Sequence, residues 1–147
     1  LGDKIVQQGQ VNMGIAVDTE RGLMVPVLRG VESLSLVQIA QSVKPLAEAC
    51  VKGDINPDLL AGGTFNITNL GALGVETFTP VLNAPEVAIL GISRAEMKPK
   101  WNGKDFEPRL MMPFSMSYDH RVIDGAEGVR FTTYLNGLLS DIRKLVL

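Results

Sequence analysis

The sequence predicts an α/β (α+β) fold in two layers, in which a mixed sheet carries helices on one face. Strand-like apolar segments outnumber helical ones, and turn residues link most of them as hairpins. Two segments, one after Ser35 and one after Asp124, instead place apolar residues at helical spacing. With 147 residues, 46% of them hydrophobic, the chain is long enough to bury a core. We therefore expect a single domain without internal repeats.

The first two predicted strands cover residues 11–17 and 23–28, and a turn at 19–22 separates them. Pro26 lies inside the second of these strands. Because proline has no backbone N–H to donate to a neighbouring strand, we expect an edge strand or a bulge at this point.

A helix is predicted from Ser35, whose side chain can cap the first turn, to about Lys52, where a glycine ends it. Cys50 falls on the apolar side of this helix, so we expect its thiol to be a buried core group. Pro45 should kink or split the helix, because it removes one backbone hydrogen bond. The Asn-Pro pair at 56–57 predicts the start of a second, short helix.

The middle of the chain holds two further predicted strands. Residues 64–68 alternate as a half-buried strand does, and residues 87–92 form a continuously apolar strand that we expect to be covered on both faces. A glycine-bearing loop at 69–74 follows the first of them. Its glycine spacing does not fit a dinucleotide-binding fingerprint, and no helix pattern opens behind it.

The last third of the chain begins with a hairpin signal. Asn102 and Gly103 predict a two-residue turn, because this pair accepts the two positive φ angles that such a turn requires. Residues 110–118 then predict the last long strand. Asp124 is expected to cap the closing helix, which runs to about Leu139.

Charge and composition exclude several functions. The net charge of −2 argues against a protein that binds nucleic acid or anionic membranes, since such proteins carry a basic excess. No apolar run is long enough to span a bilayer. With one cysteine and one histidine, an intrachain disulfide is impossible and a Cys/His zinc site is not expected, so we predict no metal.

His120 is the only histidine, and it lies where an apolar strand gives way to a loop. An imidazole titrates near neutral pH, so it can take the proton of a thiol or a hydroxyl. The alternative is that the histidine belongs to an exposed charged turn and that Asp124 is a plain helix cap. If His120 is catalytic, the substrate brings the nucleophile, and a thiol suits this chemistry. Thr68 and Asn69 end a strand and are candidate donors to an oxyanion.

Residues 119–126, Asp-His-Arg-Val-Ile-Asp-Gly-Ala, match the His-x-x-x-Asp-Gly signature of the dihydrolipoamide acyltransferases. These proteins are the core components of 2-oxo acid dehydrogenase complexes, and their fold is related to that of chloramphenicol acetyltransferase. The resemblance covers nearly the whole chain, since further segments fit in the same order: residues 14–19, 22–27, 62–71, 83–91 and 108–111. The amino-acid sequences of these segments most resemble those of the acetyltransferases of pyruvate dehydrogenase complexes.

The resemblance implies a role for each candidate residue. His120 would be the base that deprotonates a thiol of coenzyme A or dihydrolipoamide. The hydroxyl of Thr68 would hydrogen-bond the tetrahedral oxyanion, and Asp124 would hold the active-site loop. Leu90 matches a residue near the channel of the thiol cofactor. Coenzyme A and the lipoyl group would both be substrates, and the acyl group would most closely fit acetyl.

The resemblance also implies an assembly. The family forms trimers whose active sites lie between subunits, and the trimers build 24-mer or 60-mer cores that bind decarboxylase and dihydrolipoamide dehydrogenase components. The apolar ending at 145–147 would pack between trimers. By this analogy the protein would lie in the bacterial cytoplasm, or in the mitochondrial matrix of a eukaryote.

Residues 1–147 match about the C-terminal two thirds of the family's catalytic domain, without its first third and without a lipoyl or subunit-binding domain. We therefore expect this stretch to transfer acyl groups poorly when isolated. Two alternatives remain open: a structural core that assembles without activity, and a free acetyltransferase of the chloramphenicol type.

Overall fold

The computed structural model describes residues 4–145. The strands are β1 (Met13–Ile15), β2 (Val17–Thr19), β3 (Gly22–Met24), β4 (Val27–Leu28), β5 (Phe65–Asn69), β6 (Ala88–Ile92), β7 (Glu96–Trp101), β8 (Phe106–Met111) and β9 (Phe114–Tyr118). The long helices are α1 (Leu36–Lys52) and α2 (Gly125–Leu139). Short 3-10 helices are η1 (Val31–Ser33), η2 (Pro57–Leu60), η3 (Gly71–Leu73) and η4 (Ile142–Leu145).

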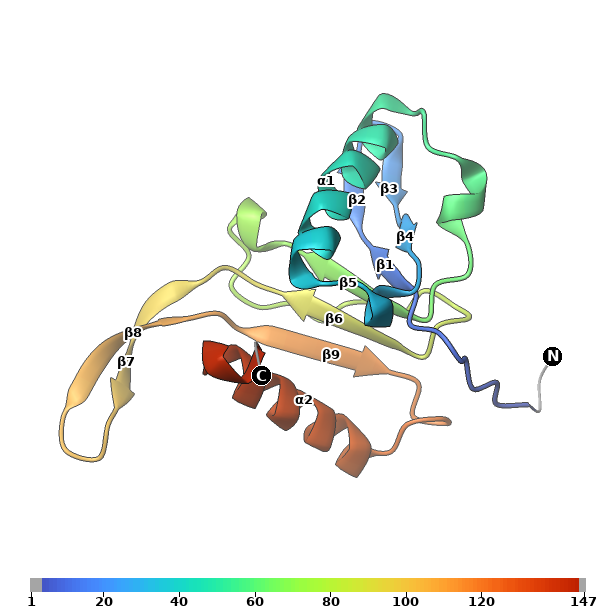
Figure 1. The fold of residues 1–147 in the computed structure, drawn as a ribbon. Coiled ribbons are helices and arrows are strands. Elements are labelled where there is room, and N and C mark those ends of the chain that lie inside the picture. Colours follow the sequence, from blue (N-terminus) through green and yellow to red (C-terminus); the bar gives the residue numbers. More distant parts are fainter. Residues whose placement is uncertain (1–3, 146–147) are drawn as a thin grey trace.

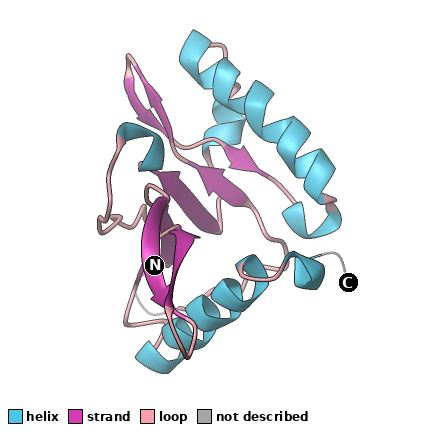
Figure 2. Ribbon diagram, turned by 90° about the vertical axis from the view of Figure 1, so that its left-hand side faces the viewer, coloured by secondary structure: helices cyan, strands magenta, loops and turns pink. Residues whose placement is uncertain are grey.

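Five strands form one mixed sheet in the order β4-β1-β5-β6-β9. The β1–β5 and β5–β6 pairs are parallel, whereas β1–β4 and β6–β9 are antiparallel. Strands β2–β3 and β7–β8 form two separate ribbons, and β7–β8 projects away from the body (Figure 1). Helix α1 lies toward the β1 end of the sheet and α2 toward β9, well apart from each other (Figure 2). The predicted fold class, a two-layer α/β arrangement around a mixed sheet, is confirmed.

The core lies around strand β6, an inner strand of the sheet between β5 and β9. Ala88, Ile89 and Leu90 are buried on both faces of this strand, as its continuous apolar run predicts. Cys50 of α1 is 1% exposed, and burial raises the pKa of its thiol, as expected for a core group. Phe131 of α2 packs against the start of β5. No helix among residues 4–145 is long and apolar enough to cross a bilayer.

Local hydrogen bonds fix the ends of helix α1. The Ser35 side chain accepts from the backbone N–H of Gln38, and the Gln38 side chain accepts from the N–H of Ser35, which completes a capping box. Gly53 ends the helix with a φ of 78°, a conformation that favours glycine. The helix is not split at Pro45. Pro45 has no N–H to donate to the carbonyl of Gln41, four residues earlier. Because Gln41 and Pro45 are both exposed, water can donate to this carbonyl instead.

Two of the predicted N-terminal strands are divided. The first breaks after Ile15, because Ala16 donates to the carbonyl of Ile67 while the residues beyond it join the β2–β3 ribbon. The second breaks before Val27, where Pro26 interrupts the ladder and β4 becomes the edge of the sheet. The expectation of an edge at Pro26 is confirmed.

Two expectations near the C-terminal hairpin are wrong. Trp101 pairs with Phe106, so the loop has four residues, not two. The side chain of Asn102 accepts from the backbone N–H groups of Lys104 and Asp105, both at 2.8 Å, and this local turn replaces the tighter one. The predicted strand at 110–118 is also interrupted, before β9.

The interruption lies at Met112 and Pro113, between β8 and β9. The proline cannot donate to a ladder, but its carbonyl accepts from the N–H of Ser93 at 3.0 Å. This bond ties the root of the hairpin to the end of β6. The ribbon and the five-stranded sheet are therefore separate units joined at this point.

Candidate active site

The turn that carries His120 is held by backbone hydrogen bonds. The N–H of Asp119 donates to the carbonyl of Val87 at 2.8 Å, which attaches the end of β9 to the start of β6. The carbonyl of Asp119 accepts from the N–H of Val122 at 2.9 Å and closes the turn. His120 lies at the exposed apex of this turn. Its imidazole therefore sits on a fixed backbone and is open to an incoming substrate.

An aromatic ring lies beside the imidazole. The ring centroids of Tyr118 and His120 are 5.7 Å apart, with the planes tilted by 40°. Tyr118 can lie against α2 because residue 128 is glycine: a Cβ at Gly128 would come within 2.9 Å of the tyrosine ring. Among residues 4–145, no hydrogen bond to the imidazole is formed. The Tyr118 ring thus limits the rotation of His120 on one side and leaves both ring nitrogens open.

Asp119 and Arg121, the residues before and after the histidine, form an ion pair with each other. The Nε and Nη2 atoms of Arg121 donate to the two carboxylate oxygens of Asp119, at 2.9 and 2.6 Å. The backbone N–H of Arg121 donates to the same carboxylate at 3.0 Å. The hydrogen bonds from the Arg121 side chain and then from its backbone lower the pKa of Asp119 to about 2. Asp119 therefore remains a carboxylate at neutral pH.

Asp124 caps helix α2, as the sequence predicts. Its carboxylate accepts from the backbone N–H of Glu127 at 2.8 Å. This hydrogen bond is the main cause of a lowered pKa, with smaller contributions from the N–H of Ala126 and the charges of Arg130 and His120. Asp124 therefore fixes the start of the helix behind the histidine turn, close enough for the two charges to interact.

Thr68 lies on β5, where it is half-buried and paired with Gly91 of β6. His120 follows Tyr118, which pairs with Ala88 at the other end of β6. Along β6, the partners of these pairs, Gly91 and Ala88, are three residues apart, and the imidazole lies beyond Ala88. At about 3.3 Å per residue, the separation along the strand direction is therefore roughly 10–13 Å. Within one chain, the structure does not bring the hydroxyl of Thr68 and the imidazole together.

Leu90 is 7% exposed and lies in the core of the chain. It pairs with Ile67 on one side and with Met116 on the other. Since neighbouring residues of a strand point to opposite faces, its side chain lies on the face away from the Thr68–Gly91 pair. Its placement near a thiol channel stays a prediction.

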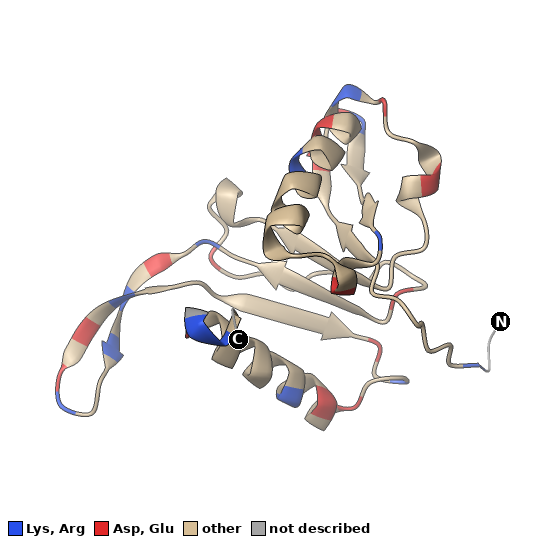
Figure 3. Ribbon diagram, viewed as in Figure 1, with Lys and Arg blue, Asp and Glu red and all other residues tan. Residues whose placement is uncertain are grey.

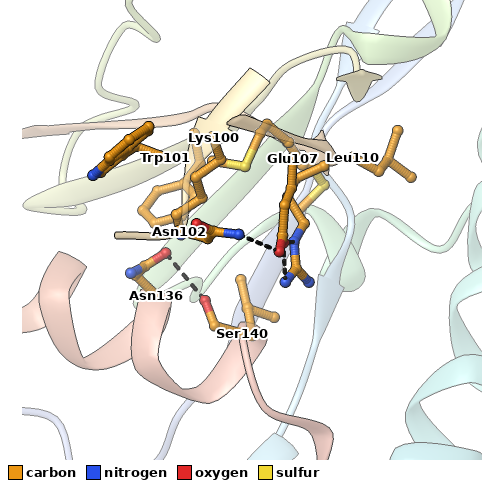
Figure 4. A pocket seen from close by; sticks show the side chains of 12 residues that line it. Lys100, Trp101, Asn102, Glu107, Leu110, Asn136 and Ser140 are labelled. Carbon is orange, nitrogen blue, oxygen red and sulfur yellow. Dashed lines mark hydrogen bonds and ion pairs between the residues drawn. The ribbon is translucent and has the colours of Figure 1, made fainter. Parts of the chain in front are cut away.

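Two of the pockets in the described part of the chain are large enough to hold a small molecule. One, of about 470 Å³, lies between the β7–β8 ribbon and the end of α2, where Glu107 points toward Asn102 and Asn136 toward Ser140 (Figure 4). The other, of about 420 Å³, lies between α2 and the starts of β5 and β6. Neither is lined by His120 or Thr68. Residues 4–145 also contain no group of three His, Cys, Asp or Glu side chains that could hold a metal ion.

Two supports of His120 could not be recognised in the sequence. The Asp119–Arg121 ion pair follows an Asp-x-Arg spacing, which alone indicates only a charged turn. The Tyr118 contact depends on a glycine inside a helix, Gly128, and such a glycine is a signal of close packing. Strands β5, β6 and β9 themselves carry no charged residue, so the charge of the site comes from the turn and the helix end (Figure 3).

Residues 2–147 match the family model described as 2-oxoacid dehydrogenases acyltransferase (catalytic domain). The chain is 47% identical over 146 residues to the dihydrolipoyllysine-residue acetyltransferase component of the pyruvate dehydrogenase complex of Cupriavidus necator. This match covers 99% of the chain and 26% of that protein. The chain thus spans about a quarter of the length of this relative.

Two solved structures share the fold. The dihydrolipoamide acetyltransferase (E2p) of Azotobacter vinelandii is 51% identical, with a TM-score of 0.95. The cubic core of a pyruvate dehydrogenase multienzyme complex is 50% identical, also with a TM-score of 0.95. In both, the match covers 99% of this chain and 60% of the other.

Proposed function

The chain belongs to the family of 2-oxoacid dehydrogenase acyltransferase catalytic domains, and from this we propose that it transfers acetyl groups between dihydrolipoamide and coenzyme A. The protein that contains it would be the dihydrolipoyllysine-residue acetyltransferase of a pyruvate dehydrogenase complex. The relatives named above support this substrate choice, since they are acetyltransferases of that complex.

One observation carries the assignment of the residues. The study of the Azotobacter vinelandii enzyme concerned the role of a serine, a histidine and an asparagine in its catalytic mechanism. These three residues have the same spacings, 52 and then 4 positions, as Thr68, His120 and Asp124 of this chain. Threonine keeps the hydroxyl of serine, and aspartate keeps a side-chain oxygen that caps the helix. We therefore assign His120, Thr68 and Asp124 to the corresponding positions.

The exposed imidazole of His120 would act as the general base. It takes the proton from the thiol of coenzyme A, and the resulting sulfur nucleophile attacks the carbonyl carbon of acetyl-dihydrolipoamide. The tetrahedral intermediate carries negative charge on oxygen, and the Thr68 hydroxyl donates a hydrogen bond to it. When the intermediate collapses, the C–S bond to dihydrolipoamide breaks, and the imidazolium returns its proton to the departing sulfur. The acetyl group is then bonded to coenzyme A, and no oxidant is required.

The separation of Thr68 and His120 supports a site made by two copies of the chain. We propose that His120 of one subunit faces Thr68 of its neighbour within a trimer, and that trimers assemble into a larger core. The structural relative that forms a cubic core supports a 24-mer. Decarboxylase and dihydrolipoamide dehydrogenase components would bind this core. A bacterial cytoplasmic location fits the bacterial relatives named above.

The test replaces His120 by alanine in the full-length protein and measures acetyl transfer from acetyl-coenzyme A to dihydrolipoamide. We expect turnover to fall by about 10²–10⁴-fold, the usual contribution of a general base. Sedimentation velocity should show unchanged assembly. A Lys104→Ala variant, at the exposed hairpin tip, is the control. Unchanged turnover in the His120→Ala protein would instead support a structural core without this chemistry.

A further inference from the structure

The dipeptide Asn-Gly occurs twice in the chain, at Asn102–Gly103 and at Asn136–Gly137. An asparagine in this context can lose its side-chain amide without an enzyme, because the backbone nitrogen of the next residue attacks the side-chain carbonyl carbon. Glycine favours this attack, since it has no side chain to obstruct the approach and its backbone is the most mobile. The two dipeptides are identical, but the structure gives them opposite surroundings.

The Asn102 pair lies in the loop at the tip of the β7–β8 hairpin, directly after Trp101, and both of its residues are exposed. Within residues 4–145, the N–H of Gly103 donates no hydrogen bond. A Cβ added at Gly103 would meet no atom within 4 Å, so the space around this residue is open. The nitrogen that has to attack is therefore outside the strand ladder and free to move.

Two backbone donors point at the side-chain oxygen of Asn102. The N–H groups of Lys104 and Asp105 both donate to its Oδ1 atom at 2.8 Å. Attack on the neighbouring Cγ atom moves negative charge onto this oxygen, and N–H donors already in place at such a distance stabilise that charge. The loop thus polarises the amide of Asn102 beside a nitrogen that is free to attack it.

The Asn136 pair lies inside helix α2. There the N–H of Gly137 is directed along the helix to a carbonyl one turn earlier, and the helical dihedral angles keep its nitrogen away from the Asn136 side chain. The backbone carbonyl of Asn136 accepts from the N–H of Ser140 at 3.0 Å, which holds the same turn from the other side. Attack at Asn136 therefore requires this end of the helix to open first.

We propose that Asn102 is a site of spontaneous covalent modification, at which the amide is converted to aspartate and isoaspartate through a cyclic imide. Hydroxide takes the proton of the Gly103 nitrogen, which bonds to Cγ of Asn102. The departing amino group takes a proton from water, its bond to Cγ breaks, and ammonia leaves. A water molecule then opens the ring at one of its two carbonyls. The net reaction consumes one water and releases one ammonia, without an oxidant or a reductant.

The modification changes the contacts of Glu107. The Nδ2 atom of Asn102 donates to the Glu107 carboxylate at 2.6 Å (Figure 4). This hydrogen bond is the main cause of a lowered pKa of Glu107, followed by the hydrogen bond from Arg109. Conversion replaces the donor by a second carboxylate, and like charges this close repel each other. The pKa of Glu107 should therefore rise, and the loop should become less stable.

The test compares the two pairs within one sample. The full-length protein is held in mildly alkaline buffer, and mass spectrometry follows the peptides that contain Asn102 and Asn136. We expect Asn102 to convert at least about tenfold faster, because conversion at Asn136 must wait for local opening of the helix. In urea the two rates should converge. Equal rates in the folded protein, or a preference for Asn102 that persists unchanged in urea, would overturn the proposal.

The products identify the route. Ring opening of the imide gives isoaspartate as well as aspartate, whereas direct hydrolysis of the amide gives aspartate alone. We expect both products at position 102, and aspartate alone would contradict the cyclic imide.

A matched variant tests the effect on the hairpin. Asn102→Ser keeps a side-chain oxygen that can accept from the backbone but has no amide to lose. Hydrogen exchange of residues 102–107 should become faster as the parent protein ages and stay constant in the Asn102→Ser protein. Unchanged exchange in fully converted parent protein would contradict the proposed effect on the loop.

Discussion

Arg121 donates to both carboxylate oxygens of Asp119, and this pair, which we call the Asp119–Arg121 clamp, joins the residues on either side of His120 in the turn. The clamp is local, since its partners are two positions apart. It stabilises the His120 turn, whose residues His120 and Arg121 are exposed and so gain little from packing. Its strength depends on the carboxylate being ionised, and this gives it a definite dependence on pH.

The first prediction concerns that dependence. Because the pKa of Asp119 falls from 3.8 to about 2 in the folded protein, the clamp stabilises the fold fully above pH 4. This contribution should be lost as the pH falls from about 4 to 2. Urea midpoints of the parent and Asp119→Asn proteins should therefore differ by a constant amount between pH 5 and 7 and converge toward pH 2. A difference that persists at pH 2 would show that the clamp is not electrostatic.

The second prediction separates the two roles of Asp124. Asparagine can still accept the hydrogen bond from the N–H of Glu127, whereas alanine cannot. At pH 7 we expect Asp124→Asn to retain most of the thermal stability and Asp124→Ala to lose more. If the residue acts by holding the His120 turn, acetyl transfer should follow the same order. Equal losses in the two variants would mean that the charge matters, not the cap.

The third prediction tests the shared site by complementation. His120→Ala and Thr68→Val proteins should each transfer acetyl groups poorly, the latter by about 10²–10³-fold for the loss of one oxyanion donor. In co-assembled mixtures, roughly a quarter of the sites would combine an intact histidine with an intact threonine from the neighbouring copy. Activity should reappear to that extent. A mixture no more active than its components would place both residues in one chain's site.

The fourth prediction concerns two glycines with opposite surroundings. A Cβ at Gly14 would overlap the buried side-chain oxygen of Asn66, so Gly14→Ala should destabilise the protein by about 1–3 kcal/mol. Gly137 lies in α2, and a Cβ added there would meet no neighbouring atom within 4 Å. Gly137→Ala should therefore stabilise the protein by about 0.5–1 kcal/mol. Denaturant unfolding of the two variants against the parent measures both signs.

Features that depend on a few neighbouring residues could be predicted from the sequence. The caps at Ser35 and Asp124, the C-terminal glycine of α1 and the buried run of β6 all appear where the pattern places them. The strand breaks near Ala16 and Pro113 do not, because each depends on a hydrogen bond to a distant strand. The predicted contact of residues 145–147 between trimers falls partly outside the described residues.

By itself, the sequence determined the local elements of the candidate site: the turn that carries His120, the helix capped by Asp124 and the strand that ends near Thr68. Only the tertiary structure decided that Thr68 of β5 lies beside one end of β6 and the His120 turn beside the other. The physical reason is that caps and turns are stabilised by hydrogen bonds within four residues. The positions of Thr68 and His120 follow from strand direction and register, which are set by pairings across 20 residues or more.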